Sequence, residues 1–339
     1  MTRPGTAPVP PPEERVPYVA PFLSDRIAGL HLEHLRTCQG LTVEEVADEV
    51  SARSAHRPGP GHIDALEGGT SVALRRAASG GALESYLAGY RLGGRVARSD
   101  YYTVFAPGAA GPDECVDKGP GWPHRLLLLE QRSEEILYAA STVVPVALRT
   151  RGYDDVLWAK GVCRLPPGLP TPATAALTGV GCQLCQVYRA DLLTDRDVAG
   201  AWVRAVRAAQ RAALTERLAR PGPPVTALLN ETLLRPFADT VHAHADQMGH
   251  LAHLVRTTRL TVRFVSLAGG ATVIEEAVRL TPPGTRRPWT VRPGFAGAHY
   301  VVGVPLGVAM AEERALDPAT SLGLLEDAAA GAVHKLGSL

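Results

Sequence analysis

The stretch LTVEEVADEVSARSAHRPGPGHIDALEGG, residues 41–69, constrains the fold of this chain more than any other segment. Thr42 and Glu45 have the spacing of a capping box, so a helix is expected to begin at Thr42. That helix cannot continue through Pro58–Gly61, because proline lacks an amide hydrogen and glycine is a poor helix former. A second, short helix is expected over HIDALEGG, so two short helices must meet across a Pro-Gly joint.

Residues 21–95 are predicted to form a small all-helical bundle. The segment 24–38 places its apolar side chains on one helical face and ends at Gly40, and residues 42–52 repeat this pattern. The stretches VALRRAA and ALESYLAGYRL have helical periodicity as well. Residues 1–20 are rich in proline and lack the apolar core of a signal peptide, so we expect them to form a disordered tail.

Residues 96–125 are predicted to be a linker or a long loop, because glycine and proline are too frequent there for regular structure. LLLLEQRSEEILYAA, which begins at Leu126, predicts a helix, and so does the long stretch 195–218. Near the C-terminus, DPATSLGLLEDAAAGAVHKL predicts a capped amphipathic helix.

Two segments of the second half have strand character. Residues 224–231 and 260–267 are rich in apolar and β-branched residues, and the stretch 238–256 between them has helical periodicity. A strand, a helix and a strand in this order predict a crossover unit in a mixed sheet. We therefore expect an α+β protein, in which the N-terminal all-helical bundle is followed by a larger mixed α/β domain over 126–339.

The charge balance gives no electrostatic reason to expect a nucleic-acid partner. The 339 residues include 35 Lys and Arg and 34 Asp and Glu, and the segment 25–95 has eight Arg, no Lys and nine acidic residues. Because DNA-binding domains neutralise phosphates with basic side chains, any DNA contact must come from local geometry. No apolar run approaches the roughly 20 residues that cross a bilayer, and five Cys form no disulfide framework. We expect a cytoplasmic protein with no membrane partner.

Several motifs of the chain resemble those of a known class of regulators. The pattern LEHLRTCQGLTVEEVADEV followed by HIDALEGG resembles the lambda-repressor-like, XRE-type helix-turn-helix of actinobacterial regulators. Four later segments are similar to the DUF5753 domain that usually accompanies it, namely residues 129–157, 206–236, 244–271 and 315–329. The resemblance implies a bacterial DNA-binding transcriptional regulator, a homodimer that responds to a small molecule or a protein partner and is often encoded near genes of specialised metabolism.

The joint between the two DNA-reading helices departs from the family pattern. About six extra residues are inserted, and Gly and Pro stand where the second helix of the family presents hydrogen-bonding groups to base edges. Direct reading is left to His62 and Asp64, and a carboxylate repels phosphate. We therefore expect weakened base readout, with arginines that hold phosphates. The predicted DNA-binding residues are Arg53, Arg57, His62, Arg75 and Arg76.

Five polar residues of the second domain are candidates for a ligand site. They are Tyr153, Arg207, Gln210, Glu231 and Tyr300. Glu231 matches a glutamate that the resemblance implies at this strand end, where a carboxylate can face a cleft, bind a cationic group or act as a base. It can equally be a structural residue that caps the helix of TLLRPF. Arg149 stands where the family has a glutamine.

Two other groups of side chains have the spacing of metal ligands. Cys182 and Cys185 form a C-x-x-C motif with Cys163 upstream, which can bind zinc or cycle through a disulfide, or pack as small apolar residues. Four polar residues share one face of the helix at 238–256: His242, Asp246, His250 and His253. Neither group has the second set of ligands that a metal site requires, so we expect no metal and no other cofactor.

Two classes of function fit these features. The first is a DNA-binding transcriptional regulator of the XRE/DUF5753 type that responds to a ligand or a partner. The alternative is a regulator scaffold repurposed as a biosynthetic enzyme or small-molecule binder, which the opened joint and the Cys-bearing segment 158–195 favour. A third interpretation is a module that binds an intact homologue without reading DNA. The sequence contains no G-x-S-x-G, Walker, H-E-x-x-H or dinucleotide motif that would name a reaction.

Overall fold

The computed structural model describes the chain in several stretches. The described residues are 22–55, 57–80, 82–92, 101, 104, 111–119, 121–160, 171–172, 192–193, 196–236, 240–267, 274, 276–294 and 297–331. For residues 79, 171–172, 192–193 and 196–206 the backbone alone is described. The predicted tail at 1–20 lies outside these ranges, as do Cys163, Cys182 and Cys185.

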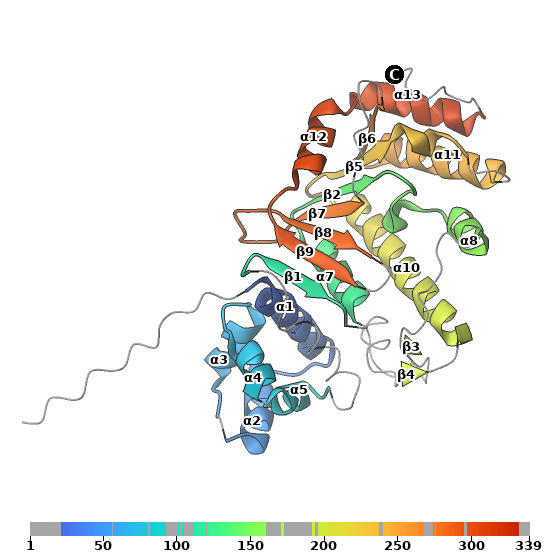
Figure 1. Ribbon diagram of the computed structural model, residues 1–339. Helices are drawn as coiled ribbons and strands as arrows, with labels where there is room; N and C mark the ends of the chain where they lie inside the picture. The colour runs from blue at the N-terminus through green and yellow to red at the C-terminus, as the bar shows by residue number, and fades with distance from the viewer. Residues whose placement is uncertain are drawn as a thin grey trace, which may run out of the picture.

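The N-terminal part consists of short helices, as the sequence predicted (Figure 1). They are α1 (Leu23–Cys38), α2 (Val43–Arg53), α3 (Pro60–Glu67), α4 (Ala73–Gly80) and α5 (Leu83–Gly89). The capping box before α2 is confirmed, since Thr42 Oγ1 accepts from the Glu45 amide at 3.1 Å and the Glu45 carboxylate accepts from the Thr42 amide at 2.7 Å. Pro60 then starts α3, at a position where its missing amide hydrogen costs nothing.

Helix α1 crosses α3 at short range. A Cβ atom on Gly29 would lie 2.3 Å from the carbonyl oxygen of Leu66 and 2.8 Å from that of Glu67, so only glycine fits this crossing. The Glu67 carboxylate accepts hydrogen bonds from Arg36 at 2.8 Å and from the Tyr90 hydroxyl at 3.0 Å. These contacts join α1, α3 and the end of α5, so the helix that follows the Pro-Gly joint is held firmly in place.

The second part is built on a seven-stranded mixed sheet (Figure 1). Its strands are β1 (Glu114–Asp117), β2 (Glu135–Ala140), β5 (Val225–Asn230), β6 (Leu260–Val265), β7 (Ala277–Thr281), β8 (Trp289–Pro293) and β9 (Ala298–Val302). Their order is β1-β9-β8-β7-β2-β5-β6, in which β2, β5 and β6 are parallel and the remaining neighbours antiparallel. The α+β class and the parallel crossover unit are therefore confirmed. A separate two-stranded pair joins β3 (Thr171–Pro172) to β4 (Leu192–Leu193).

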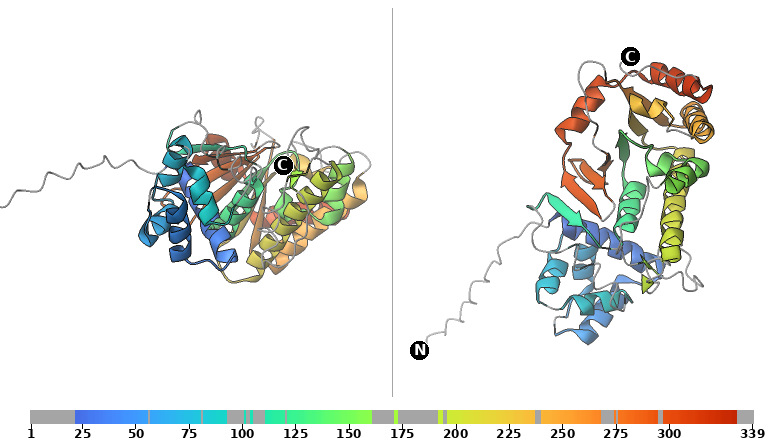
Figure 2. Two further views of the ribbon diagram at one scale, coloured as in Figure 1. Left: turned by 90° about the horizontal axis from the view of Figure 1, so that it is seen from below. Right: turned by 45° about the vertical axis from the view of Figure 1, so that its right-hand side comes forward.

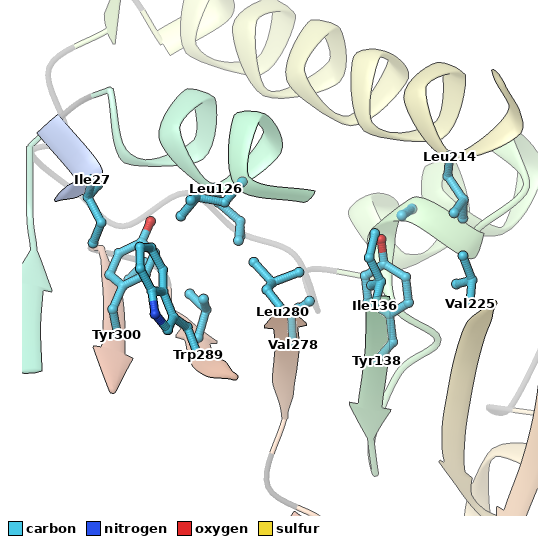
Figure 3. Packing of buried hydrophobic residues seen from close by; sticks show 14 of the residues in the cluster. Ile27, Leu126, Ile136, Tyr138, Leu214, Val225, Val278, Leu280, Trp289 and Tyr300 are labelled. Atoms are coloured by element: carbon cyan, nitrogen blue, oxygen red, sulfur yellow. The ribbon is translucent and has the colours of Figure 1, made fainter. Parts of the chain in front are cut away.

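Helices cover both faces of this sheet, as Figure 2 shows from two further sides. They are α7 (Trp122–Arg132), α8 (Arg151–Ala159), α10 (Arg196–Ala219), α11 (Val241–Thr257), α12 (Leu306–Arg314) and α13 (Pro318–Ala329), with 3-10 turns η1 (Val146–Leu148) and η2 (Glu231–Leu234). In the main core, Leu126 of α7 lies over Leu280 of β7, and Leu214 of α10 lies over Ile136 and Tyr138 of β2 (Figure 3). Leu137, between them in sequence, belongs to a smaller core with α12 on the opposite face.

Two predictions of secondary structure were wrong. Residues 135–140, predicted as helix, form the central strand β2, because Ser133 ends α7 and the segment then pairs with β5 on one side and β7 on the other. Residues 114–117, predicted as irregular, form β1 at the sheet edge. Its pairing with β9 buries Cys115 and Asp117. The free energy gained by this pairing and burial exceeds the cost of ordering a segment flanked by glycine and proline. The division of the chain into domains stays a prediction.

Helix α1 also packs on the sheet part of the molecule. Ile27 lies beside Leu126 and Tyr300 in the core, where Figure 3 shows all three. His31 is buried and lies 2.9 Å from His124 of α7, and the Tyr101 hydroxyl lies 2.7 Å from its other ring nitrogen. Burial and the neighbouring positive groups hold the pKa of His31 well below its usual value. One continuous core therefore runs from the helical part into the sheet.

Substitution of Gly29 tests the crossing of α1 and α3. We expect Gly29→Ala to lower the free energy of unfolding by about 1–3 kcal/mol, because the new methyl group must displace backbone of α3. The matched control is Gly323→Ala within α13, where a Cβ atom meets nothing within 4 Å. Removing a helical glycine there should stabilise the protein by about 0.5–1 kcal/mol. Urea unfolding curves measure both changes, and equal effects at the two sites would contradict the close crossing.

Candidate functional site

The first turn of α3 carries few groups that can read a base. Pro60 and Gly61 are exposed but have no polar side-chain atom, and Asp64 is the next exposed residue. His62 is half-buried, with its Nε2 atom 3.3 Å from the Tyr86 hydroxyl. In the described part of this turn, the group most open to solvent is therefore a carboxylate, which accepts hydrogen bonds from cytosine but repels phosphate.

Arg75 forms an ion pair within the helical part. Its guanidinium lies 3.2 Å from the buried Asp25 carboxylate and 3.5 Å from the centre of the Phe22 ring. Burial raises the pKa of Asp25, whereas the Phe22 amide and Arg75 oppose that rise. A phosphate would have to compete with this pair, so Arg75 is primarily a structural residue that joins α4 to the start of α1.

The remaining predicted phosphate anchors lie at the surface. Arg53 is exposed and pairs with Glu49 one turn earlier on α2, while Arg57 and Arg76 are exposed. Surface pairs of this kind contribute about 0–1 kcal/mol, so Arg53 is easily released. The exposed side of α2 also bears three acidic residues: Glu44, Glu45 and Asp48. This face of the helical part is thus mixed in charge, with no excess of positive charge on α2.

An arginine cluster lies between α8 and α10. The buried Asp154 carboxylate accepts hydrogen bonds from Arg149 at 3.1 Å, from Arg207 at 2.9 Å and from Arg211 at 3.3 Å. The guanidinium of Arg207 also lies 5.5 Å from the ring centre of Trp158, close enough for a cation-π contact. Three guanidinium groups thus converge on one buried carboxylate.

The turn that leads into α8 is held by hydrogen bonds from α11. Gln247 of α11 is fully buried, accepts from the Thr150 amide at 2.6 Å and donates to the Leu148 carbonyl at 2.9 Å. Thr150 in turn caps α8 by accepting from the Tyr153 amide at 3.2 Å. Two of the predicted ligand residues therefore belong to the surroundings of the arginine cluster, Tyr153 as a buried neighbour and Gln210 as a half-buried residue one turn from Arg207. The prediction included Arg207 but missed Asp154, Arg211 and Trp158.

The other two predicted ligand residues are placed elsewhere. Glu231 is buried, and its carboxylate accepts from the Leu267 amide at 2.9 Å, so it fastens the chain that leaves β6. The cap of η2 is Asn230, whose side chain accepts from the Thr232 amide at 2.9 Å. The interpretation of Glu231 as a helix cap is therefore wrong, although its structural role is evident.

Tyr300 is fully buried on β9, in the core beneath α1 and α7. Its neighbours include Asp117 and Arg125, which form a fully buried bidentate pair with distances of 2.6 and 2.8 Å. Burial raises the pKa of Tyr300 well above its usual value, so the phenol stays neutral. Its side chain is 0% exposed and belongs to the main core, so Tyr300 is a core residue.

The histidine row of α11 points largely into solvent. His242, Asp246 and His253 are exposed, and His250 is half-buried with its pKa lowered by burial and by His253. Within the described residues, no three His, Cys, Asp or Glu side chains gather closely enough to hold a metal ion. The C-x-x-C motif and Cys163 lie outside the described residues. No described helix is long and apolar enough to cross a membrane.

Glu130 is a buried carboxyl group whose pKa is raised. It is buried on α7 beside Tyr138 of β2, and burial raises its pKa to about 8, although the Tyr138 hydrogen bond and Arg217 oppose the rise. A buried acid of this kind is a candidate proton donor only where a substrate can reach it. Glu130 lies under α10 in the core, so its raised pKa affects stability rather than chemistry.

The pH dependence of stability tests this burial. Because the folded pKa of Glu130 lies above its ordinary value of 4.5, its contribution is fully present below that value and is lost as the pH rises toward about 8. We expect Glu130→Gln to make the free energy of unfolding less dependent on pH between 5 and 8.5 and to stabilise the protein at the alkaline end. Glu134→Gln, at an exposed site, is the control. Identical pH profiles for wild type and Glu130→Gln would refute the argument.

Comparisons with known proteins place one part of the chain. Residues 185–287 match DUF5753, a domain of unknown function, which falls within the DUF5753-like region predicted at 126–339. The match covers α10, β5, α11, β6 and β7, and it includes three predicted ligand residues: Arg207, Gln210 and Glu231. It covers less than half of the chain and none of the helical part. No curated protein and no solved structure matches the chain.

Proposed function

We propose that this protein is a cytoplasmic DNA-binding transcriptional regulator that acts as a homodimer. Its α/β part binds the ligand or protein partner to which the regulator responds. The arrangement of α2 and α3 carries this proposal, because two short helices packed on each other after α1 are the framework of a helix-turn-helix. The DUF5753 match of residues 185–287 agrees with the resemblance that suggested a regulator.

Base readout is expected to be weak. A good bidentate contact to a base contributes about 1–3 kcal/mol of discrimination, and the first turn of α3 offers half-buried His62 and acidic Asp64 for this purpose. Phosphate contacts remain available to Arg57 and Arg76, which are exposed. Binding carried by such contacts depends strongly on salt and weakly on sequence.

A second candidate is a regulator scaffold that now serves as a small-molecule binder or a biosynthetic enzyme. Two observations favour it: the acidic exposed side of α2, and the arginine cluster around Asp154 in the other part. The acidic residues would face phosphates if α2 approached DNA as the first helix of a helix-turn-helix does, and this repulsion opposes binding.

A DNA titration across a salt series separates the two candidates. For the regulator we expect binding of upstream-region duplex with a negative slope of log K against log salt. Arg57→Gln and Arg76→Gln should each reduce that slope by about 1 and weaken random-sequence and upstream duplexes alike. Arg220→Gln, at an exposed arginine that pairs with Glu216 at the end of α10, should leave the slope unchanged. Absence of binding at low salt would reject the regulator and favour the second candidate.

A further inference from the structure

Arg207 and Arg211 bring two positive charges to the single carboxylate of Asp154, which they share among the described residues. Arg149 also approaches this carboxylate. The side chains of Arg149 and Asp154 are 5% and 7% exposed, which limits the screening of this charge by water. Arg207 and Arg211 are also one turn apart on α10, where like charges repel each other.

Two of these arginines retain hydrogen-bonding capacity toward solvent. A guanidinium has five N–H donors, and Arg207 and Arg211 each direct one terminal nitrogen to Asp154. Their side chains are 14% and 22% exposed, so part of each side chain is open to water. Arg149 is different, because its Nε atom donates to the Val144 carbonyl and its side chain is nearly enclosed.

The cluster is held in a defined geometry. Asp154 and Arg149 lie on the turn and helix that Gln247 and Thr150 fix, and Arg207 is restrained by its contact with Trp158. Guanidinium groups ordered in this way lose little further freedom when a ligand arrives. A planar fork of donors matches an oxyanion with two acceptor oxygens, either a carboxylate or a phosphate.

We propose that Arg207 and Arg211 bind the carboxylate or phosphate group of a small-molecule ligand, with Asp154 and Arg149 as positioning residues. The proposal rests on the sensing role proposed for the α/β part, and it does not require that the helical part binds DNA. The ligand's oxyanion accepts hydrogen bonds from donors of both arginines that Asp154 does not use, and it neutralises positive charge on Arg207 and Arg211. Trp158 is half-buried beside Arg207, so the adjoining part of the ligand lies near an aromatic ring.

Isothermal titration of the full chain with sodium phosphate, sodium acetate and sodium benzoate tests the proposal. Sodium chloride holds the ionic strength constant and is the blank. We expect saturable binding of phosphate or of the carboxylates, weakened at least tenfold in Arg207→Gln and in Arg211→Gln. The control is Arg151→Gln on α8, an 88% exposed arginine paired with Asp155, which should bind like wild type. Circular dichroism and urea unfolding establish that each variant is folded.

The outcomes are distinct. Binding of phosphate alone identifies a phosphate ester as the ligand class, and binding of acetate or benzoate alone identifies a carboxylate. If folded wild type binds none of the three anions saturably, or if both arginine variants bind as tightly as wild type, the proposal is overturned and the cluster only braces α8 against α10. The DNA titration on the same samples is read separately, because anion binding without DNA binding refutes the regulator and leaves the anion site standing.

Discussion

The double burial of helix α1 is the constraint on which the rest of the structure depends. On one side α1 crosses α3 so closely that Gly29 has no room for a side chain, and on the other it packs on α7, β1 and β9. It also carries His31, a polar residue within this core, whose two ring nitrogens form hydrogen bonds with His124 and with the Tyr101 hydroxyl. A buried polar group that loses its partner costs about 1–3 kcal/mol, so a rotation or shift of α1 is opposed from both parts at once.

The sequence predicted an element correctly where the hydrophobic periodicity of the segment agreed with its burial in the folded protein. Helices α10, α11 and α13 and strands β5 and β6 were predictable, because their patterns extend over whole elements. Strand β2 was not, since Glu, Leu and Ala favour helices and burial on both faces removes the alternation that marks a strand. Strands β7, β8 and β9 are five residues long, and their antiparallel partners determine their conformation more than their own composition does.

The candidate ligand site was predictable only in part, for a related reason. Arg207 was selected, but Arg211 one turn later was not, although the spacing places both on the same side of one helix. Their shared partner Asp154 lies 53 residues before Arg207, and no local pattern connects the two positions. Arg75 shows the same dependence on a residue distant in sequence: it resembles a phosphate anchor because it stands beside Arg76, but its guanidinium contacts the buried Asp25 carboxylate of α1.

Helix α10 determines how the arginine cluster could influence the helical part. Arg207 and Arg211 lie on it, and Arg217, two turns later, donates to the carbonyls of Glu130 and Ser133 at the end of α7. Helix α7 packs on α1, which contacts both the helical part and the sheet. A ligand that displaces α10 therefore acts on α1 through α7. Contact alone is not coupling, because the ligand must bind one arrangement of α1 better than another. If it does, linkage requires DNA to change the affinity for the anion by the same factor, so the effect can be sought from either end.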